Sequence, residues 1–201
     1  MILRIEDPMV PGTKLRKADV DNATGKEFLR KVFFVSDGVM LTQIREVSGI
    51  DGSTLQNWTQ RGWVANAKLR KYNIDQVAHI LIINMLRSCM QLDRIAFLVR
   101  YINGSVVDRS DDIIPDADLY DYICRTIEKL NHAEIADEGK LRAIIREVTA
   151  DYEEKIEGAT LRLHNALEII VLAYCAAQIR RVSGELVDRL MQENPDVIDL
   201  A

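Results

Sequence analysis

Apolar residues recur at helical spacing along most of the chain, and few helix breakers interrupt this pattern. The 201 residues include only 4 prolines and 10 glycines, which favours long helices over a strand-rich fold with many turns. The spacing predicts helices over residues 24–35, 42–48, 53–61, 73–89, 92–102, 119–130, 135–156 and 160–192. We therefore expect an all-α protein that ends in a long-helix C-terminal domain.

The overall composition is that of a soluble protein with a hydrophobic core. Hydrophobic residues make up 48% of the chain and charged residues 28%. Residues 1–8 lack the long apolar region of a signal peptide. The longest apolar run, 166–179, is shorter than the roughly 20 residues that span a bilayer, and it contains Glu168 and Gln178. We therefore expect a cytoplasmic protein without a membrane partner.

Charge is distributed unevenly along the chain. Residues 1–103 carry 15 Lys and Arg against 10 Asp and Glu, whereas residues 104–201 carry 11 against 21. A basic half beside an acidic half is typical of a protein that binds a polyanion through one end. Chance sorting of surface charge would give the same pattern, so the asymmetry is supporting evidence only.

Residues 41–72 have the pattern of a helix-turn-helix. Gly49 suits the tight turn that such a motif requires between its two helices. Asp51 or Ser53 can cap the second helix, and Gly62 can end it. The spaced apolar positions of the motif are filled by Ile44, Ile50, Leu55 and Trp58. The pattern therefore predicts a second helix whose polar face is free to enter the major groove of DNA.

The predicted site consists of polar and basic side chains on this second helix and on the loop that follows it. These are residue types that bind base edges and phosphates. We expect the DNA-binding residues to be Ser53, Thr54, Gln56, Asn57, Gln60, Arg61, Lys68, Arg70 and Lys71. Gln56, Asn57 and Arg61 are the strongest candidates to recognise or grip DNA, and the three basic residues of the loop would contact phosphates.

The stretch from Gly49 to Val64 resembles the MerR group of transcription regulators without a gap. The shared features are the turn glycine, Thr54-Leu55, an aromatic residue at position 58 and Arg61-Gly62. Arg70-Lys71-Tyr72-Asn73 resembles the exit of that group's wing, and residues 91–95 resemble the start of the helix that follows. The resemblance implies a MerR-like helix-turn-helix with a short wing, which binds double-stranded DNA.

The chain is similar, more closely, to an uncharacterised bacterial family of MerR-like proteins with a domain of unknown function. The similarity covers roughly residues 30–130 and implies a sequence-specific transcription regulator. It rests on the segments Gln56-Asn57-Trp58, Arg61-Gly62-Trp63-Val64, Ile82-Ile83-Asn84-Met85-Leu86, Tyr101-Ile102-Asn103-Gly104 and Asp111-Asp112-Ile113-Ile114.

Three features depart from the MerR pattern. Arg45 occupies a position where helix-turn-helix motifs usually have a small buried residue, which predicts looser or rotated packing of the first helix. The loop between Trp63 and Tyr72 is shorter than the wing of metal-sensing or drug-sensing relatives. The cysteines of the metal-sensing relatives have no counterpart here, so metal sensing does not carry over.

The predicted domain order is an N-terminal arm over 1–23, a MerR-like DNA-binding domain over 24–104 and an acidic helical domain over 105–201. The last would dimerise and could sense an effector of unknown identity. The arm contains Lys14, Arg16 and Lys17, which would touch the DNA backbone, although a flexible tail fits equally well.

The helix over 160–192 is apolar nearly all round between residues 166 and 179 and must be buried. Either an internal core or a homodimer interface would bury it. A homodimer is attractive because a helix-turn-helix usually doubles to recognise a palindrome.

The remaining chemistry-bearing residues do not predict a catalytic or metal site. His79, His132 and His164 have no His or Cys partner at zinc-site spacing and are expected to be surface or core histidines. The cysteines, at positions 89, 124 and 175, are expected to be reduced core residues. The aspartates of 105–118 lack the glycine of a calcium loop and are expected to form a solvated linker with a capping aspartate. Since no nucleotide-binding or hydrolase motif is present, we expect no enzyme and no cofactor.

Two alternatives to a regulator remain open. The chain could be a helical interaction or scaffold protein that does not bind DNA, or a small-molecule-binding or catalytic helical domain. A basic face over 53–71 would favour the regulator, and an acidic or buried second helix would favour the scaffold. A polar pocket lined by residues 120–180 would favour the third class.

Overall fold

The computed structural model describes residues 9–33, 38–105, 108–130 and 138–195. Within these ranges the elements are η1 (Lys17–Val20), α1 (Gly25–Phe33), β1 (Val39–Met40), α2 (Leu41–Ser48), α3 (Gly52–Gln60), β2 (Lys71–Tyr72), α4 (Ile74–Leu86), α5 (Leu92–Asn103), α6 (Asp116–Leu130), α7 (Glu138–Val148) and α8 (Ala159–Glu193). Helices dominate, which confirms the predicted all-α class apart from the short antiparallel pair of β1 and β2.

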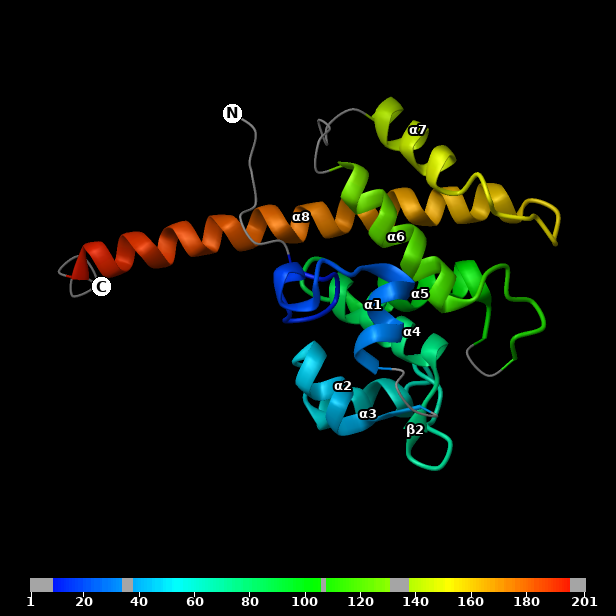
Figure 1. Cartoon of the computed structure of the whole chain (residues 1–201), viewed down its shortest axis with the longest axis horizontal. Helices are drawn as coiled ribbons and strands as arrows, with labels where there is room; N and C mark the ends of the chain where they lie inside the picture. Colours follow the sequence, from blue (N-terminus) through cyan, green and yellow to red (C-terminus); the bar gives the residue numbers. More distant parts are fainter. Residues whose placement is uncertain (1–8, 34–37, 106–107, 131–137, 196–201) are drawn as a thin grey trace.

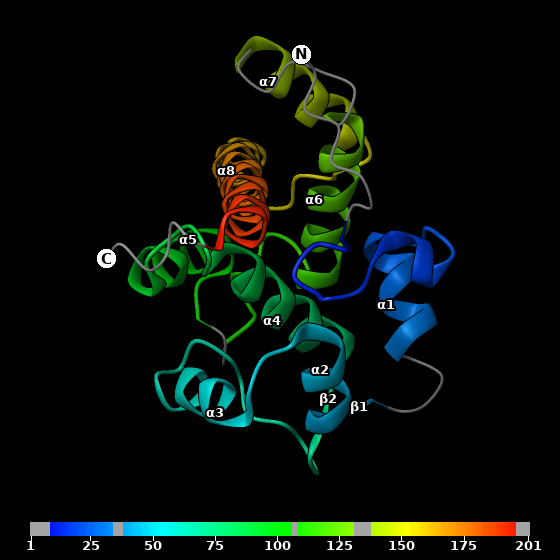
Figure 2. The same ribbon diagram turned by 90° about the vertical axis from the view of Figure 1, so that its left-hand side faces the viewer.

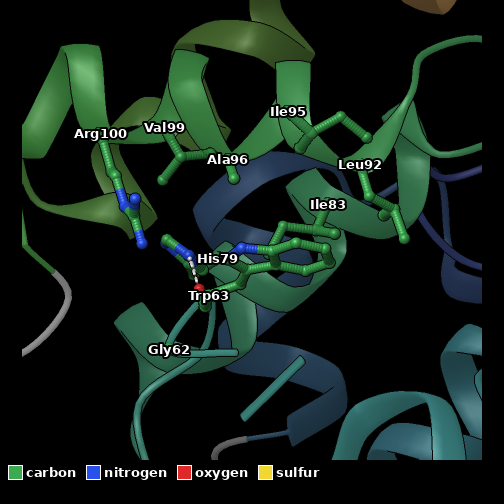
Figure 3. Close-up of a pocket in the computed structure, with 9 residues that line it drawn as sticks. All are labelled: Gly62, Trp63, His79, Ile83, Leu92, Ile95, Ala96, Val99 and Arg100. Atoms are coloured by element: carbon green, nitrogen blue, oxygen red, sulfur yellow. Dashed lines mark hydrogen bonds between the residues drawn. The ribbon is translucent and has the colours of Figure 1, made fainter. Parts of the chain in front are cut away.

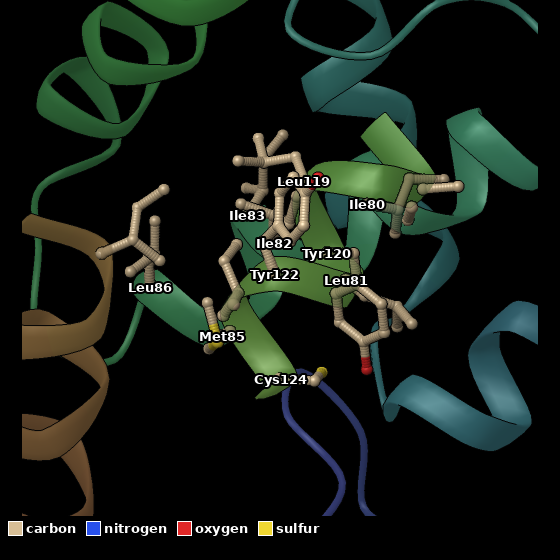
Figure 4. Packing of buried hydrophobic residues seen from close by; sticks show 14 of the residues in the cluster. Ile80, Leu81, Ile82, Ile83, Met85, Leu86, Leu119, Tyr120, Tyr122 and Cys124 are labelled. Carbon is tan, nitrogen blue, oxygen red and sulfur yellow. The ribbon is translucent and has the colours of Figure 1, made fainter. Parts of the chain in front are cut away.

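The centre of the protein is formed by α4 and α6. Helix α4 buries nine of its 13 residues, and it contacts α1, α2, α6 and α8. Figure 4 shows its isoleucine and leucine side chains, among them Ile82 and Leu81, packed against Leu119 and Tyr120 of α6. Because α4 is covered on several sides, its sequence is apolar nearly all round, unlike that of a surface helix.

One continuous core runs through the described part of the chain. The cluster of buried residues extends from Val10 to Cys175 and includes members of α1, α4, α6, α7 and α8. The core therefore continues across residue 104, where the sequence predicts a domain boundary. Among the described residues, no helix combines the length and the apolar character needed to cross a membrane.

Helix α8 lies across the body with its first half and extends past the other helices with its second half (Figure 1). One face of the first half is buried against α4, α5, α6 and α7. On the outer side, Ile169, Leu172 and Ile179 are 45%, 42% and 53% exposed. Of the two predicted ways to bury 166–179, the internal core therefore accounts only for the inner face, and the outer face is uncovered in the single chain.

Local signals in the sequence predict most helix ends correctly. The Asn73 side chain accepts from the backbone N–H of Gln76, and the Gln76 side chain accepts from the backbone N–H of Asn73, which forms the predicted capping box. Helix α4 ends at Leu86 rather than near residue 89. Cys89 therefore lies on an exposed turn, and the prediction that it is a core residue is wrong. Helix α7 ends at Val148, eight residues before the predicted end.

The N-terminal segment packs onto the body from residue 9 onward and is not the predicted free arm. Lys17 is buried, and its Nζ donates to Glu128 Oε1 at 2.9 Å, so it is unavailable for a DNA phosphate. The Tyr120 hydroxyl donates to the carbonyl of Pro11 at 2.7 Å. At Gly12, where φ is +77°, a Cβ atom would lie 2.3 Å from the Leu81 carbonyl oxygen, so only glycine fits. Residues 1–8 of the predicted arm lie outside the described residues.

Candidate nucleic-acid interface

Helices α2 and α3 are joined by a turn that local hydrogen bonds hold in place. We call residues 41–72 the α2–β2 unit. The buried hydroxyl of Ser48 donates to the carbonyl of Ile44 at 2.6 Å and accepts from the backbone N–H of Ile50 at 3.2 Å. Gly49 follows with φ of +71°, the left-handed conformation that glycine adopts readily. The predicted turn glycine is therefore where the chain needs it.

Helix α2 is oriented with Ile44 and Ser48 inward, so Arg45 points outward. Arg45 is exposed, and its guanidinium lies about 4 Å from the position that a Cβ atom would take on Gly52, at the start of α3. The unusual residue type at position 45 therefore adds a surface cation beside α3. The amide of Asn84 in α4 donates to the Ser48 carbonyl at 3.0 Å and ties the turn to the body.

Helix α3 presents an uncharged polar face to solvent. Leu55 and Trp58 are 2% and 1% exposed and anchor the inner face. The outer face carries Ser53, Gln56, Asn57 and Gln60, all exposed. Among the described residues, the side chains of Gln56, Asn57 and Gln60 have no hydrogen-bond partner. These three amides are therefore available to an external ligand.

The two hydroxyl residues at the start of α3 are less available than the sequence suggests. The hydroxyls of Ser53 and Thr54 donate to the Asp51 carboxylate at 2.5 and 2.7 Å, and the backbone N–H of Thr54 also donates to it at 2.7 Å. These hydrogen bonds, that of Ser53 first, hold the pKa of Asp51 well below its usual range. As DNA-contacting residues, Ser53 and Thr54 could therefore offer only acceptor oxygens while this cap is formed.

A short hairpin lies, like α3, at the end of the molecule away from α8 (Figures 1 and 2). We call residues 68–71 the hairpin tip. Lys68 and Lys71 exchange two backbone hydrogen bonds, of 3.0 and 2.8 Å. The residues between them, Leu69 and Arg70, both have positive φ, +49° and +64°. Two central residues with positive φ define a type I′ turn, a conformation that costs a non-glycine residue about 1 kcal/mol or more.

The surroundings of α3 are basic. The α2–β2 unit contains five basic residues against two acidic ones. All five basic residues, Arg45, Arg61, Lys68, Arg70 and Lys71, are exposed. Arg61, at the C-terminal end of α3, lies with its guanidinium carbon 5.1 Å from the centre of the Trp63 ring, which restricts its orientation. The structure thus exposes all four predicted basic residues of the site and adds Arg45 as a fifth exposed cation.

A buried charged network links the segment after α3 to the helical body, and sequence analysis missed it. His79 Nε2 donates to the Trp63 carbonyl at 2.8 Å, as Figure 3 shows, and Nδ1 lies 3.2 Å from Asp116 Oδ1. The guanidinium of Arg109 donates to the other oxygen of Asp116 at 2.8 Å. Asp116 is 2% exposed, so the prediction of a solvated linker with a capping aspartate does not describe this residue, which is buried in an ionic network.

His79 is best satisfied as the charged imidazolium. Both of its ring nitrogens face acceptors, so both contacts are kept only when both nitrogens carry a proton. Burial by itself lowers the pKa of His79, but the Asp116 carboxylate outweighs burial, and the net shift is upward. The same network lowers the pKa of Asp116 against the effect of its burial.

We expect the free energy of unfolding to fall as pH rises above 6.5, because His79 then loses its proton. A histidine with a raised pKa contributes its full stabilisation below its ordinary pKa of 6.5, and this contribution is lost as pH rises through the raised value. Chemical denaturation of the wild type and of His79→Gln at several pH values measures this loss as the difference between the two proteins.

Comparison with His79→Gln separates this effect from other titrations. Burial raises the pKa of Asp112 to about 6, so its effect on the free energy of unfolding changes mostly below pH 6.5. Burial lowers the pKa of His164, which acts in the opposite direction and is present in both proteins. If the difference in free energy of unfolding between the wild type and His79→Gln does not become smaller as pH rises, His79 is neutral in the folded protein.

A small pocket lies next to this network. It is enclosed by Gly62, Trp63, His79 and side chains of α4 and α5, as Figure 3 shows. Its volume is about 10 Å³, which is room for about one water molecule. It lies between the α2–β2 unit and α5, and not among residues 120–180, where a polar pocket would have favoured a small-molecule-binding or catalytic domain.

The α2–β2 unit, α4, α5 and α6 fall within one sequence family. The profile described as Domain of unknown function (DUF1836) matches residues 28–132, more than half of the chain. The chain belongs to the DUF1836 family. It is also similar to "Uncharacterized protein YkrK" of Bacillus subtilis (strain 168), with 23% identity over 158 residues that cover 74% of this chain and 68% of that protein. No solved structure matches the chain.

The DUF1836 match confirms the predicted membership of an uncharacterised domain-of-unknown-function family. The matched region contains the whole candidate interface and the pair of His79 and Asp116, but neither α7 nor α8. The family domain therefore includes both the candidate interface and the buried pair of His79 and Asp116 that links it to the helical body.

Proposed function

We propose that this DUF1836 protein is a sequence-specific DNA-binding transcription regulator with a MerR-like helix-turn-helix. In this proposal α2 and α3 form the motif, α3 lies in the major groove, and the hairpin that ends at β2 acts as a short wing. The order of a two-helix unit, a short hairpin and further helices is the order that the MerR resemblance implies. Binding at a promoter would block or reshape it.

The observation that carries the proposal is the outer face of α3 together with the hairpin. Gln56, Asn57 and Gln60 present amides without partners among the described residues, and the neighbouring hairpin tip carries three exposed cations. Amide and guanidinium groups recognise base edges in the major groove, while Lys and Arg contact phosphates. This is the basic, exposed arrangement that favours the regulator over the alternative of a scaffold with a buried or acidic second helix.

A homodimer formed through α8 would complete such a regulator. Seven large apolar residues on α8 are 42–58% exposed, Val187 and Met191 among them. The other five recur along one side of the helix: Ile169, Leu172, Ile179, Leu186 and Leu190. We call them the α8 stripe. Their spacing follows positions a and d of a heptad repeat, which is the pattern of a two-helix seam. The stripe is roughly 30 Å long and continues where α8 has left the body, so a second copy can reach it.

The same stripe is the observation that favours the scaffold alternative, since a coiled-coil seam also suits a different helical protein. We favour a second copy because a helix-turn-helix protein recognises two half-sites with two identical subunits. Measurement of DNA binding separates the two functions directly.

We expect the triple variant Lys68→Ala, Arg70→Ala, Lys71→Ala to bind DNA with a weaker salt dependence. Each lost phosphate contact lowers the slope of log affinity against log salt by about 0.9 units, so three contacts correspond to about 3 units for each subunit. Affinities for a duplex enriched from a random pool by the wild type, measured at several salt concentrations, give this slope. Lys155→Ala removes an exposed cation elsewhere and should leave the slope unchanged. An equal slope in the triple variant would remove the hairpin from the interface.

A further inference from the structure

Leu69 is the most exposed large hydrophobic residue among those the structure describes. Its exposed fraction is 95%, and it stands at the hairpin tip with no core residue to pack against. A single exposed leucine on a soluble protein needs no explanation by itself. Leu69 needs an explanation because it combines this exposure with an unfavourable backbone conformation.

The sequence of the hairpin tip is a poor choice for stability. A type I′ turn with two central residues of positive φ is normally made from Asn-Gly or Gly-Gly, because those residues tolerate that conformation. Here the two positions are Leu69 and Arg70, with φ of +49° and +64°. Strained backbone of this kind concentrates at functional sites, where surrounding structure holds it in place. The pairing of β2 with β1 is that support, since it places Lys71 opposite Met40.

We propose that Leu69 is a wedge that enters the minor groove and separates two stacked base pairs. This rests on the proposed function and specifies how the hairpin binds DNA. Apolar side chains such as leucine insert between base steps in the minor groove and kink the duplex. Lys68, Arg70 and Lys71 surround Leu69 and would grip the phosphates on either side of the opened step.

DNA fits this apolar tip better than a protein surface does. A protein pocket for a leucine is usually bordered by further apolar contacts, whereas each immediate neighbour of Leu69 along the chain is a cation. The tip and α3 lie at the same end of the molecule, away from α8 (Figures 1 and 2). In this proposal a duplex with α3 in its major groove presents the neighbouring minor groove to the tip. Insertion is easiest at flexible pyrimidine–purine steps, so we expect such a step in the bound sequence.

The test uses duplexes that the full-length wild-type protein enriches from a random-sequence pool. Energy transfer between dyes on the two ends reports the bend, and permanganate reactivity of thymines reports unstacked bases. We expect a bend of roughly 20–90° and one reactive step per hairpin for the wild type. Leu69→Ala should lose both signals and about tenfold in affinity, whereas Leu69→Met, which keeps an apolar wedge, should retain them.

Leu161→Ala is the matched control, because Leu161 is 66% exposed on α8, away from the hairpin. It should bind and bend DNA like the wild type. If the wild type enriches no duplex, the proposed function and the wedge both fail. If the wild type enriches a duplex but Leu69→Ala bends and unstacks it equally, the wedge is wrong and the proposed function stands. Straight, fully stacked DNA in the wild-type complex would also overturn the wedge.

Discussion

Replacement of both Gln56 and Arg61 by alanine is expected to weaken binding to the specific site by at least about 100-fold, since each good side-chain pair with a base contributes roughly 1–3 kcal/mol. Both side chains are exposed, at the middle and the C-terminal end of α3. Truncation therefore leaves the helix, the Asp51 cap and the buried anchor Trp58 in place. Fluorescence anisotropy with specific and scrambled duplexes should show that the loss is confined to the specific one.

The variant must remain folded for this result to count. The thermal midpoint should stay within a few degrees of the wild type, because surface substitutions away from caps and cores change stability little. Lys155→Ala with Asn165→Ala is the matched control, since it removes one cation and one amide from exposed positions outside the α2–β2 unit. Unchanged specific affinity in the Gln56 and Arg61 variant would refute the assignment of α3 as the recognition helix.

Leu186→Glu with Leu190→Glu is expected to convert a homodimer into a monomer. The two leucines are 51% and 58% exposed in the single chain, so the carboxylates cost little there. In a symmetric seam they would be buried close to like charges, and we expect the dimer dissociation constant to rise by at least about 100-fold. Sedimentation over a concentration range measures this change, and affinity for a two-half-site duplex should fall with it.

Asp188→Lys provides the control for the α8 variant. Asp188 is exposed on the same stretch of α8, at the heptad position opposite the stripe. It changes the charge of the helix by the same amount as two leucine-to-glutamate replacements, in the other direction, and should leave the dimer intact. A wild-type protein that stays monomeric at high concentration would exclude the seam and would favour a different partner for α8.

Periodicity and end signals predict most of the helical fold. Asn73 with Gln76, Gly49 and Gly62 act locally, within one turn of the helix that they begin or end, so a short stretch of sequence contains the whole signal. The division of α8 into a buried face and an exposed face cannot be predicted from local signals. Its inner and outer faces are both apolar, and only the packing of α4 to α7 decides which face the core covers.

The buried network could not be predicted in the same way. His79 and Asp116 are 37 positions apart, and each looks isolated in the sequence. A run of aspartates near a proline is typical of a solvated loop, and nothing local marks the one member that turns inward to meet His79 and Arg109. Lys17 illustrates the same limit, because its partner Glu128 is 111 positions away in the sequence.

The candidate site was predicted in composition but not in detail. The set of residues on α3 and the loop follows from the helix-turn-helix pattern, and the structure leaves all of them exposed except the half-buried Thr54. The hydrogen bonds from the hydroxyls of Ser53 and Thr54 to Asp51 depend on side-chain rotamers, which the sequence does not determine. The type I′ turn at Leu69 carries no Asn-Gly signal, so the most exposed feature of the unit had none of the usual sequence markers.

The most direct test of a DNA-binding regulator is recovery of genomic fragments by the purified full-length protein at two salt concentrations. The account predicts a small set of fragments that share a palindromic sequence and persist at the higher salt, because base contacts survive when phosphate contacts are screened. Recovery that lacks sequence preference and disappears at the higher salt, or no recovery at all, would contradict it.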